Sequence, residues 1–288
     1  MAAIVEDCIR LRDGRTLAYA QYGDPGGVPI LYFHGTPGSR LEHPPALSGP
    51  VPGRVRLIVP DRPGYGRSDF QPGRTLLHWP QDVAQLADAL GLSRFAVVGV
   101  SGGGPHAAAC AYALPHRLTG VALVSSLAPV NRPGGMDHLS PWVKAAFRLG
   151  RRAPWSLRPA LWAFSNPGRD AASFFLANTE RLCPSDRMLL ARPEVQRMLR
   201  ANFQESAAQG LRAYAQDVVI FSRPWGFPLQ GITVPVCLWH GESDNILPPH
   251  MGRYLAGAMP HVRARYVPEG GHFMALDLLD EIVAALGI

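Results

Sequence analysis

Four short apolar runs, each followed directly by loop residues, constrain the fold of this chain more than any other feature. The runs cover 28–33, 55–59, 95–100 and 121–124, and they are nearly continuous instead of alternating with polar residues. A strand buried on both faces of a sheet has this pattern, because its side chains point alternately into two apolar layers. The runs therefore predict a largely parallel sheet that is covered by helices.

Stretches with helical spacing separate these runs, and the pattern resumes after residue 230. Helices are predicted over 81–90, 102–114, 251–258 and 277–286, and two more strands over 234–239 and 263–267. This alternation of strand and helix is typical of a doubly wound α/β sheet. A β-hairpin is expected near the start of the chain, where Asp13 and Gly14 separate two segments with strand character.

The segment 130–229 interrupts this alternation, because it has no clear buried strand and its apolar residues recur at helical spacing. It contains 12 of the 25 aromatic residues and carries 14 basic against 7 acidic side chains. We expect a helical insertion here, and a core domain made of 1–129 and 230–288. The aromatic residues either form a core of the insertion or line a substrate pocket under a lid, for which Trp142 and Trp162 are candidates.

The formal net charge of +6 raises the question of a nucleic-acid partner. We expect none, because no basic run, zinc-ligand spacing or basic and aromatic alternation accompanies the charge. The four cysteines stand far apart, which predicts small buried side chains instead of disulfides. No run of 18 apolar residues predicts a membrane span, and acidic residues interrupt the N-terminal segment where a signal peptide would be apolar. The sequence thus favours a cytoplasmic protein with no membrane partner, and it leaves the oligomeric state open.

The strongest local motif is Gly-Val-Ser-Gly-Gly at 99–103, which lies between a predicted buried strand and an alanine-rich helix. A serine at the tip of such a turn has a strained backbone and close neighbours, so glycine is required two residues before and two residues after it. The start of the helix also points backbone N–H groups at the place where an oxyanion would form. We therefore expect Ser101 to be a nucleophile.

A serine nucleophile needs a base and a carboxylate that orients this base. Asp244 and His272 lie in the loops after the last two predicted strands. Because the carboxyl ends of parallel strands meet at one edge of a sheet, both side chains can converge on Ser101. Glu242 remains an alternative carboxylate, although its position in the loop favours Asp244. The histidines show no metal-ligand spacing, so we expect neither a metal nor a cofactor.

Four separated motifs resemble those of the α/β-hydrolase superfamily, in the branch with a helical cap between the sixth and seventh strands. They are the segment 34–38 (His-Gly-Thr-Pro-Gly), the segment 61–68, the turn at Ser101, and the loops with Asp244 and His272. The resemblance implies an α/β-hydrolase fold, with a mostly parallel central sheet flanked by helices. It also implies that Ser101 is the nucleophile, that His272 is the general acid and base, and that Asp244 orients this histidine.

The same resemblance implies an oxyanion hole formed by the backbone N–H groups of Thr36 and Gly102. Two further residues beside the motifs, His34 and Phe273, are candidates for the substrate pocket. A histidine at the start of this oxyanion motif more often holds the shape of the loop. By the resemblance, Asp61 belongs to a structural turn and has no role in the chemistry.

These features predict a carboxylesterase-like serine hydrolase that cleaves an ester or related acyl bond of a small, largely apolar substrate. Ser101 argues against the dehalogenases and epoxide hydrolases of this fold, which use an aspartate nucleophile. A proline iminopeptidase remains an alternative in which Glu205 would hold the amino group of the substrate, although the excess of basic residues in the insertion disfavours a cationic ligand. A non-hydrolytic biosynthetic enzyme or a small-molecule receptor also remains open, because the triad and the pocket are common to all of them.

Overall fold

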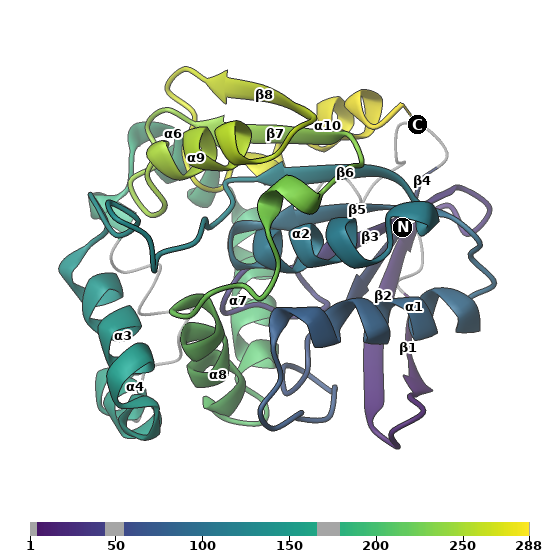
Figure 1. Cartoon of the computed structure of the whole chain (residues 1–288), viewed down its shortest axis with the longest axis horizontal. Helices are drawn as coiled ribbons and strands as arrows, with labels where there is room; N and C mark the ends of the chain where they lie inside the picture. The colour runs from purple at the N-terminus through teal and green to yellow at the C-terminus, as the bar shows by residue number, and fades with distance from the viewer. Residues whose placement is uncertain (1–4, 44–54, 166–178, 288) are drawn as a thin grey trace.

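A central sheet of eight strands, with helices on both faces, forms the body of the computed structural model (Figure 1). The structure describes residues 5–43, 55–165 and 179–287. The strands are β1 (Val5–Arg10), β2 (Thr16–Gly23), β3 (Val28–Phe33), β4 (Val55–Pro60), β5 (Phe95–Val100), β6 (Leu118–Val124), β7 (Val236–Gly241) and β8 (Val262–Val267). Their order across the sheet is β1-β2-β4-β3-β5-β6-β7-β8. The pairs from β4 to β8 are parallel, and β2 is antiparallel to both of its neighbours.

Helices occupy the predicted segments between these strands. They are α1 (Trp79–Ala89), α2 (Gly104–Ala113), α3 (Pro141–Arg152), α4 (Leu157–Ser165), α6 (Pro184–Leu190), α7 (Pro193–Ser206), α8 (Arg212–Phe221), α9 (His250–Ala258) and α10 (Leu279–Ala285). The predicted α/β architecture and the N-terminal hairpin of β1 and β2 are confirmed, with element ends that differ by a few residues. Among the described helices, none is long and apolar enough to cross a membrane.

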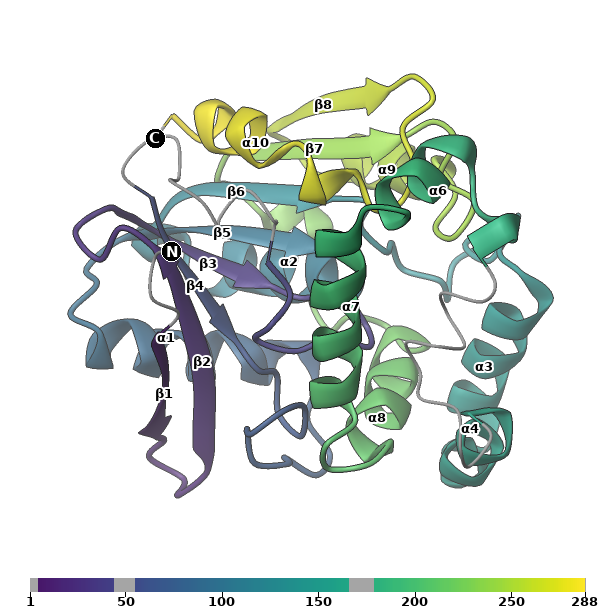
Figure 2. The same cartoon turned by 180° about the vertical axis from the view of Figure 1, so that it is seen from behind.

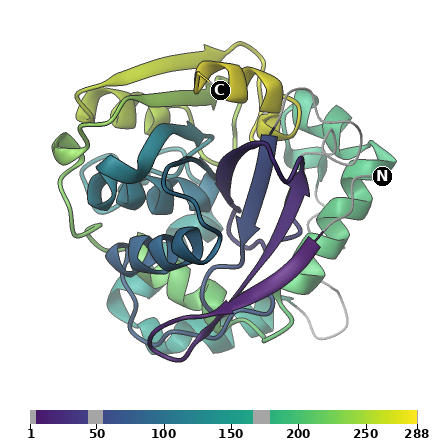
Figure 3. The ribbon, with the colours of Figure 1, turned by 90° about the vertical axis from the view of Figure 1, so that its right-hand side faces the viewer.

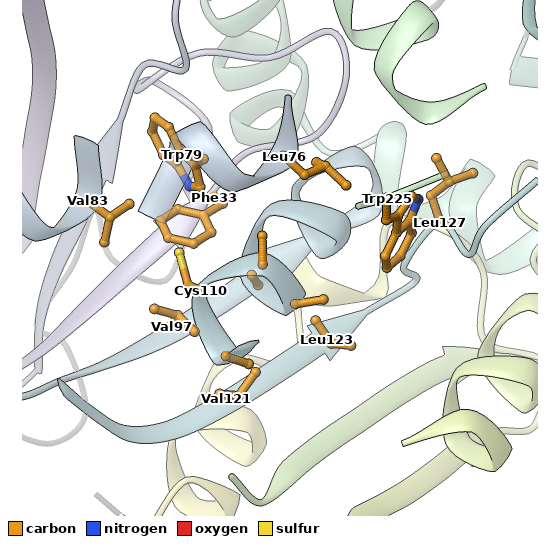
Figure 4. Close-up of a cluster of buried hydrophobic side chains, with 14 of the residues drawn as sticks. Phe33, Leu76, Trp79, Val83, Val97, Cys110, Val121, Leu123, Leu127 and Trp225 are labelled. Carbon is orange, nitrogen blue, oxygen red and sulfur yellow. The ribbon is translucent and has the colours of Figure 1, made fainter. Parts of the chain in front are cut away.

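Two apolar layers, one on each face of the sheet, explain why the strand runs are continuous. Leu31 and Phe33 of β3 belong to the cluster covered by α1, α2 and α9, whereas Ile30 and Tyr32 belong to the cluster under α10. Figure 4 shows the first cluster, in which Phe33 faces Trp79 and Cys110. Figure 3 shows the twist of the sheet, with the hairpin of β1 and β2 in purple crossing the view.

The helices of the segment 130–229 lie between β6 and β7 in the chain and gather beyond the carboxyl ends of the strands. Figure 2 shows α3, α4, α6, α7 and α8 on the side to which the arrows of β6, β7 and β8 point. The described residues of this segment contain helices and no strand, as predicted. The insertion therefore stands over the edge of the sheet where the candidate catalytic loops emerge.

The cysteines are free, but the prediction that all four are buried is wrong for one of them. Cys110 and Cys183 are buried and Cys237 is partly buried, whereas Cys8 is exposed. Cys8 lies on β1, which is an edge strand of the sheet and has almost no covering layer. An apolar side chain on an edge strand stays accessible because no helix packs over it.

Candidate active site

Ser101 lies at a sharp turn between β5 and α2, with a backbone φ of +53°. This left-handed conformation is rare for a residue other than glycine and marks a strained position. A Cβ atom on Gly99 would lie 2.6 Å from the carbonyl oxygen of Gly103, and one on Gly103 would overlap the carbonyl oxygen of Phe33. The two glycines of the motif are therefore required by close backbone contacts.

Three predicted residues are joined by two hydrogen bonds. His272 Nε2 lies 3.0 Å from Ser101 Oγ, and His272 Nδ1 lies 2.8 Å from Asp244 Oδ2. The other oxygen of Asp244 accepts the backbone N–H groups of Ile246 and Leu247, each at 2.9 Å, which holds the carboxylate in place. The arrangement allows Nε2 to accept the proton of the serine while Asp244 holds the ring.

Glu242, the alternative carboxylate, lies elsewhere. It is exposed and pairs with Arg253 at 3.2 Å. Asp244 is 3% exposed and contacts the imidazole directly. The carboxylate hydrogen-bonded to His272 is therefore that of Asp244, as its position in the loop favoured.

The surroundings of His272 favour its protonated form. Burial alone would lower the pKa of the imidazole, but the charge and hydrogen bond of Asp244 outweigh burial and raise this pKa. The carboxylates of Asp186 and Glu42 raise it further, and His240 also interacts with the ring. The site thus stabilises the imidazolium that forms when the ring takes a proton.

Thr36 and Gly102, the predicted oxyanion donors, lie beside each other next to Ser101. A Cβ atom on Gly102 would be 3.3 Å from the backbone nitrogen of Thr36. Among the hydrogen bonds of the described residues, none uses the N–H of Thr36. Its hydroxyl is engaged instead, because Oγ1 donates to Asp217 at 3.1 Å and accepts from Arg62 at 2.6 Å. That the backbone N–H groups of Thr36 and Gly102 bind a developing oxyanion stays a prediction.

Comparison with known proteins agrees with the observed fold. The sequence family described as "alpha/beta hydrolase fold" matches residues 28–277 of the chain. The chain belongs to the α/β hydrolase fold family.

Several relatives of this chain are named for their activity. A non-heme chloroperoxidase of Streptomyces lividans is 36% identical over 41% of this chain, which spans 44% of the length of that relative. A non-heme haloperoxidase of Rhodococcus erythropolis is 27% identical over 82% of this chain and 81% of its own. The solved structure of a thermophilic esterase from Thermogutta terrifontis is similar with a TM-score of 0.68 and 25% identity, covering 99% of this chain and 97% of that chain.

The four residues predicted to line a substrate pocket lie in different environments. Phe273 is partly buried and packs edge-on against His272, with ring centroids 5.4 Å apart. Trp142 on α3 and Trp162 on α4 are 59% and 61% exposed, so their role in a pocket stays a prediction. His34 has no exposed surface and therefore presents nothing to a substrate, which corrects that expectation.

His34 instead holds the shape of the oxyanion loop. Its Nδ1 donates to the carbonyl of Gly35 at 2.8 Å, and its Nε2 accepts the backbone N–H of Arg62 at 3.2 Å. Burial and the nearby Arg62 guanidinium hold the pKa of this ring well below its ordinary value, so it is neutral. A neutral ring can donate from one nitrogen and accept at the other, as the two contacts require.

Asp186 contacts the loop that carries His272, and the sequence analysis did not single it out. It lies in the first turn of α6 and is 1% exposed. Its carboxylate accepts the backbone N–H groups of His272 at 2.8 Å and Phe273 at 2.9 Å. A Cβ atom on Gly271 would overlap this carboxylate. In the sequence Asp186 looks like an ordinary acidic residue at a helix start, and only the adjacent glycines of the histidine loop suggest a close contact.

A second carboxylate of the insertion, that of Asp217 on α8, is fully buried next to Thr36. It forms ion pairs with Arg62 and Arg74, and it accepts the hydroxyl groups of Thr36 and Tyr65. Burial would raise the pKa of this carboxyl, but the two guanidinium groups hold it well below its usual value. The insertion is therefore tied to the oxyanion loop through a buried charged group.

Asp61, predicted to be structural, is likewise buried and accepts the backbone N–H groups of Arg40 and Arg67. Within the described ranges, no three His, Cys, Asp or Glu side chains gather as ligands for a metal ion. A site without metal or cofactor stays a prediction.

Proposed function

We propose that this protein is a serine hydrolase that cleaves the ester bond of a small, largely apolar substrate. The observation that carries the proposal is the hydrogen-bonded series from Ser101 through His272 to Asp244 at the carboxyl edge of the sheet. The strained backbone of Ser101 and the adjacent N–H groups support it. The esterase among the similar structures supports the same chemistry.

In the first half of the reaction, His272 Nε2 takes the hydroxyl proton as Ser101 Oγ bonds to the carbonyl carbon of the ester. The carbonyl oxygen becomes an oxyanion that accepts the N–H groups of Thr36 and Gly102. The bond to the leaving oxygen then breaks, and this oxygen leaves as an alcohol with the proton from His272. The acyl group remains on Ser101.

In the second half, a water molecule gives a proton to His272 and bonds to the acyl carbon. The second tetrahedral intermediate uses the same two N–H donors. Its collapse breaks the bond to Ser101 Oγ, which regains its proton from His272, and the acid product is released. Asp244 stabilises the imidazolium in both halves and keeps its own charge throughout.

The helical insertion 130–229 acts in this proposal as a cap over the substrate. Asp186 and Asp217 attach it to the histidine loop and the oxyanion loop. A cap held at both sides of the reacting atoms can exclude water and shape a pocket for a small molecule.

The proline iminopeptidase alternative is disfavoured by the placement of Glu205. This carboxylate pairs with Arg40 at 2.5 Å and lies 3.7 Å from Arg67. A carboxylate already held by two guanidinium groups is not available for the amino group of a substrate. The ester substrate therefore remains the better proposal.

Turnover of a panel of p-nitrophenyl esters, together with labelling by a fluorophosphonate probe, tests the proposal. We expect saturable hydrolysis and labelling at Ser101, and neither in the Ser101→Ala variant. A non-hydrolytic enzyme or a receptor would bind ligands in a thermal-shift screen with almost no turnover, which would overturn the hydrolase proposal.

A further inference from the structure

A cavity of about 510 Å³ lies between α8, the segment 70–76 and the start of α4. Its volume is within the range of small-molecule sites, which hold about 300 to 1,000 Å³. None of the residues that line it belongs to the series of Ser101, His272 and Asp244. Leu76 and Trp225, two of its lining residues, are shown in Figure 4. The cavity is therefore a separate concave surface and not a part of the reaction centre.

Four arginines and no acidic residue line this cavity, namely Arg74, Arg158, Arg212 and Arg223. Arg74 is buried and paired with Asp217 behind the wall. For the other three, no carboxylate of the described residues lies within ion-pair distance. Three guanidinium groups without a neutralising partner make the cavity positive and attract an anion.

Arg212 is also held in a fixed position. Its guanidinium lies over the ring of Phe70, 4.6 Å from the ring centroid, and donates to Gln209 at 3.0 Å. A guanidinium fixed in this way loses little freedom when it binds an anion through two N–H groups. Such pre-ordering distinguishes this arginine from a mobile surface charge.

Apart from Thr75 and Gln216, the rest of the cavity wall is mostly apolar. Leu76, Ala215, Ile220 and Trp225 line it, and all four are buried members of the main hydrophobic cluster. An inorganic anion alone would leave this wall uncovered. The apolar wall and the arginines line the same cavity. A ligand that fits both therefore has an apolar body and an anionic group.

We propose that this cavity binds a small organic anion with an apolar body, such as an aromatic or aliphatic carboxylate, sulfonate or phosphate ester. The anionic group contacts Arg158, Arg212 and Arg223, and the apolar body covers the wall around Trp225. The site does not depend on the chemistry at Ser101. It adjoins that chemistry through Arg74, whose partner Asp217 also accepts the hydroxyl of Thr36.

Calorimetric titration of the full chain with naphthalene-2-sulfonate tests this proposal. We expect saturable binding of one molecule per chain. The Arg158→Gln/Arg223→Gln variant should raise the Kd at least about tenfold, because two charge-assisted contacts are lost. Arg197→Gln/Arg263→Gln is the matched control, since it removes two exposed arginines outside the cavity, and its Kd should change less than about twofold. Equal losses in both variants would show attraction by net charge only and would overturn the proposal.

Two further ligands separate the parts of the site. Neutral 2-naphthalenemethanol lacks the anion and inorganic sulfate lacks the apolar body, so each should bind at least about tenfold more weakly. Sulfate binding as tight as that of the naphthalene sulfonate would overturn the assigned ligand class. Enzyme labelled at Ser101 by the fluorophosphonate should bind the sulfonate unchanged. Loss of binding after labelling would move the ligand to the reaction centre and contradict a separate site.

Discussion

The carboxylate of Asp186 accepts the backbone N–H of His272 at 2.8 Å, although 86 residues separate the two in the chain. The first residue belongs to an insertion helix, and the second belongs to the loop after β8. The second carboxylate oxygen accepts the N–H of Phe273. The conformation of the histidine loop therefore depends on a residue of the insertion.

Replacing Asp186 with Asn should lower kcat/KM roughly tenfold or more, because the amide nitrogen would face one of the two backbone N–H groups and leave it without an acceptor. The Asp186 charge also raises the pKa of His272, so its removal should move the acidic limb of the kcat/KM profile to lower pH. Glu194→Gln, an exposed acid on α7, is the control for charge alone. An acidic limb that stays in place while activity falls would indicate a purely structural role.

Asp244→Asn should reduce kcat roughly 10³- to 10⁴-fold, since the amide cannot hold the ring in the required tautomer or stabilise its positive charge. Burial lowers the pKa of His272, and the charge and hydrogen bond of Asp244 raise it. Without Asp244, any residual activity should therefore show its acidic limb at lower pH than the wild type. Steady-state kinetics across the pH range measures both effects. Glu242→Gln should behave like the wild type, and a comparable loss there would contradict the assignment.

Ser101→Ala should abolish fluorophosphonate labelling and reduce kcat by roughly 10⁴-fold or more. The remaining rate would come from binding and from the N–H donors. Alanine keeps the Cβ atom at the strained position, so the fold should persist, and circular dichroism checks this. Activity near the wild-type rate in the folded variant would rule out Ser101 as the nucleophile.

Thr36→Pro should reduce kcat about 10²- to 10³-fold, because it removes the backbone N–H proposed to bind the oxyanion. Thr36→Ala keeps this N–H and should cost less than about tenfold in kcat. Kinetics is compared only after thermal melting shows that the proline variant is folded, since proline also restricts the residue before it.

The hydroxyl of Thr36 has a different expected effect. It donates to the buried carboxylate of Asp217, so Thr36→Ala should lower the free energy of unfolding by about 1 kcal/mol. Thr36→Ser restores the donor and should recover most of this stability in urea unfolding. A large loss of kcat in the Ala variant, recovered in the Ser variant, would instead place the hydroxyl in the chemistry.

Asp217→Asn should lower the free energy of unfolding by about 3 to 5 kcal/mol at pH 7, because it leaves two buried guanidinium groups without their counterion. The folded-state pKa of Asp217 lies below its unfolded value, so the stabilisation is complete above about pH 4 and declines as the pH falls further. Urea unfolding at pH 7 and pH 3 should thus show a smaller difference at the lower pH. Asp88→Asn, which breaks an exposed pair with Arg117, should cost less than about 1 kcal/mol.

The sequence alone determined the sheet, its helices and the insertion, because these depend on periodic signals along the chain. In runs such as 28–33 and 95–100, the side chains point alternately into two apolar layers, so the runs are apolar almost throughout. The glycines around Ser101 also indicated the sharp turn, because backbone atoms come so close there that only glycine fits. Motif order placed Asp244 and His272 in loops that reach the same sheet edge.

Only the tertiary structure decided which polar groups meet. Asp244 and Glu242 are two residues apart in one loop, and their side chains point to a buried ring and to solvent respectively. His34 is buried between backbone groups, and Asp186 and Asp217 reach the loops of His272 and Thr36 from distant helices. A polar residue carries no periodic signal for its partner, because the pairing depends on side-chain directions and on the packing of segments far apart in the chain. Hydrophobic pattern determines which faces are buried, whereas the folded arrangement determines which charges share that buried space.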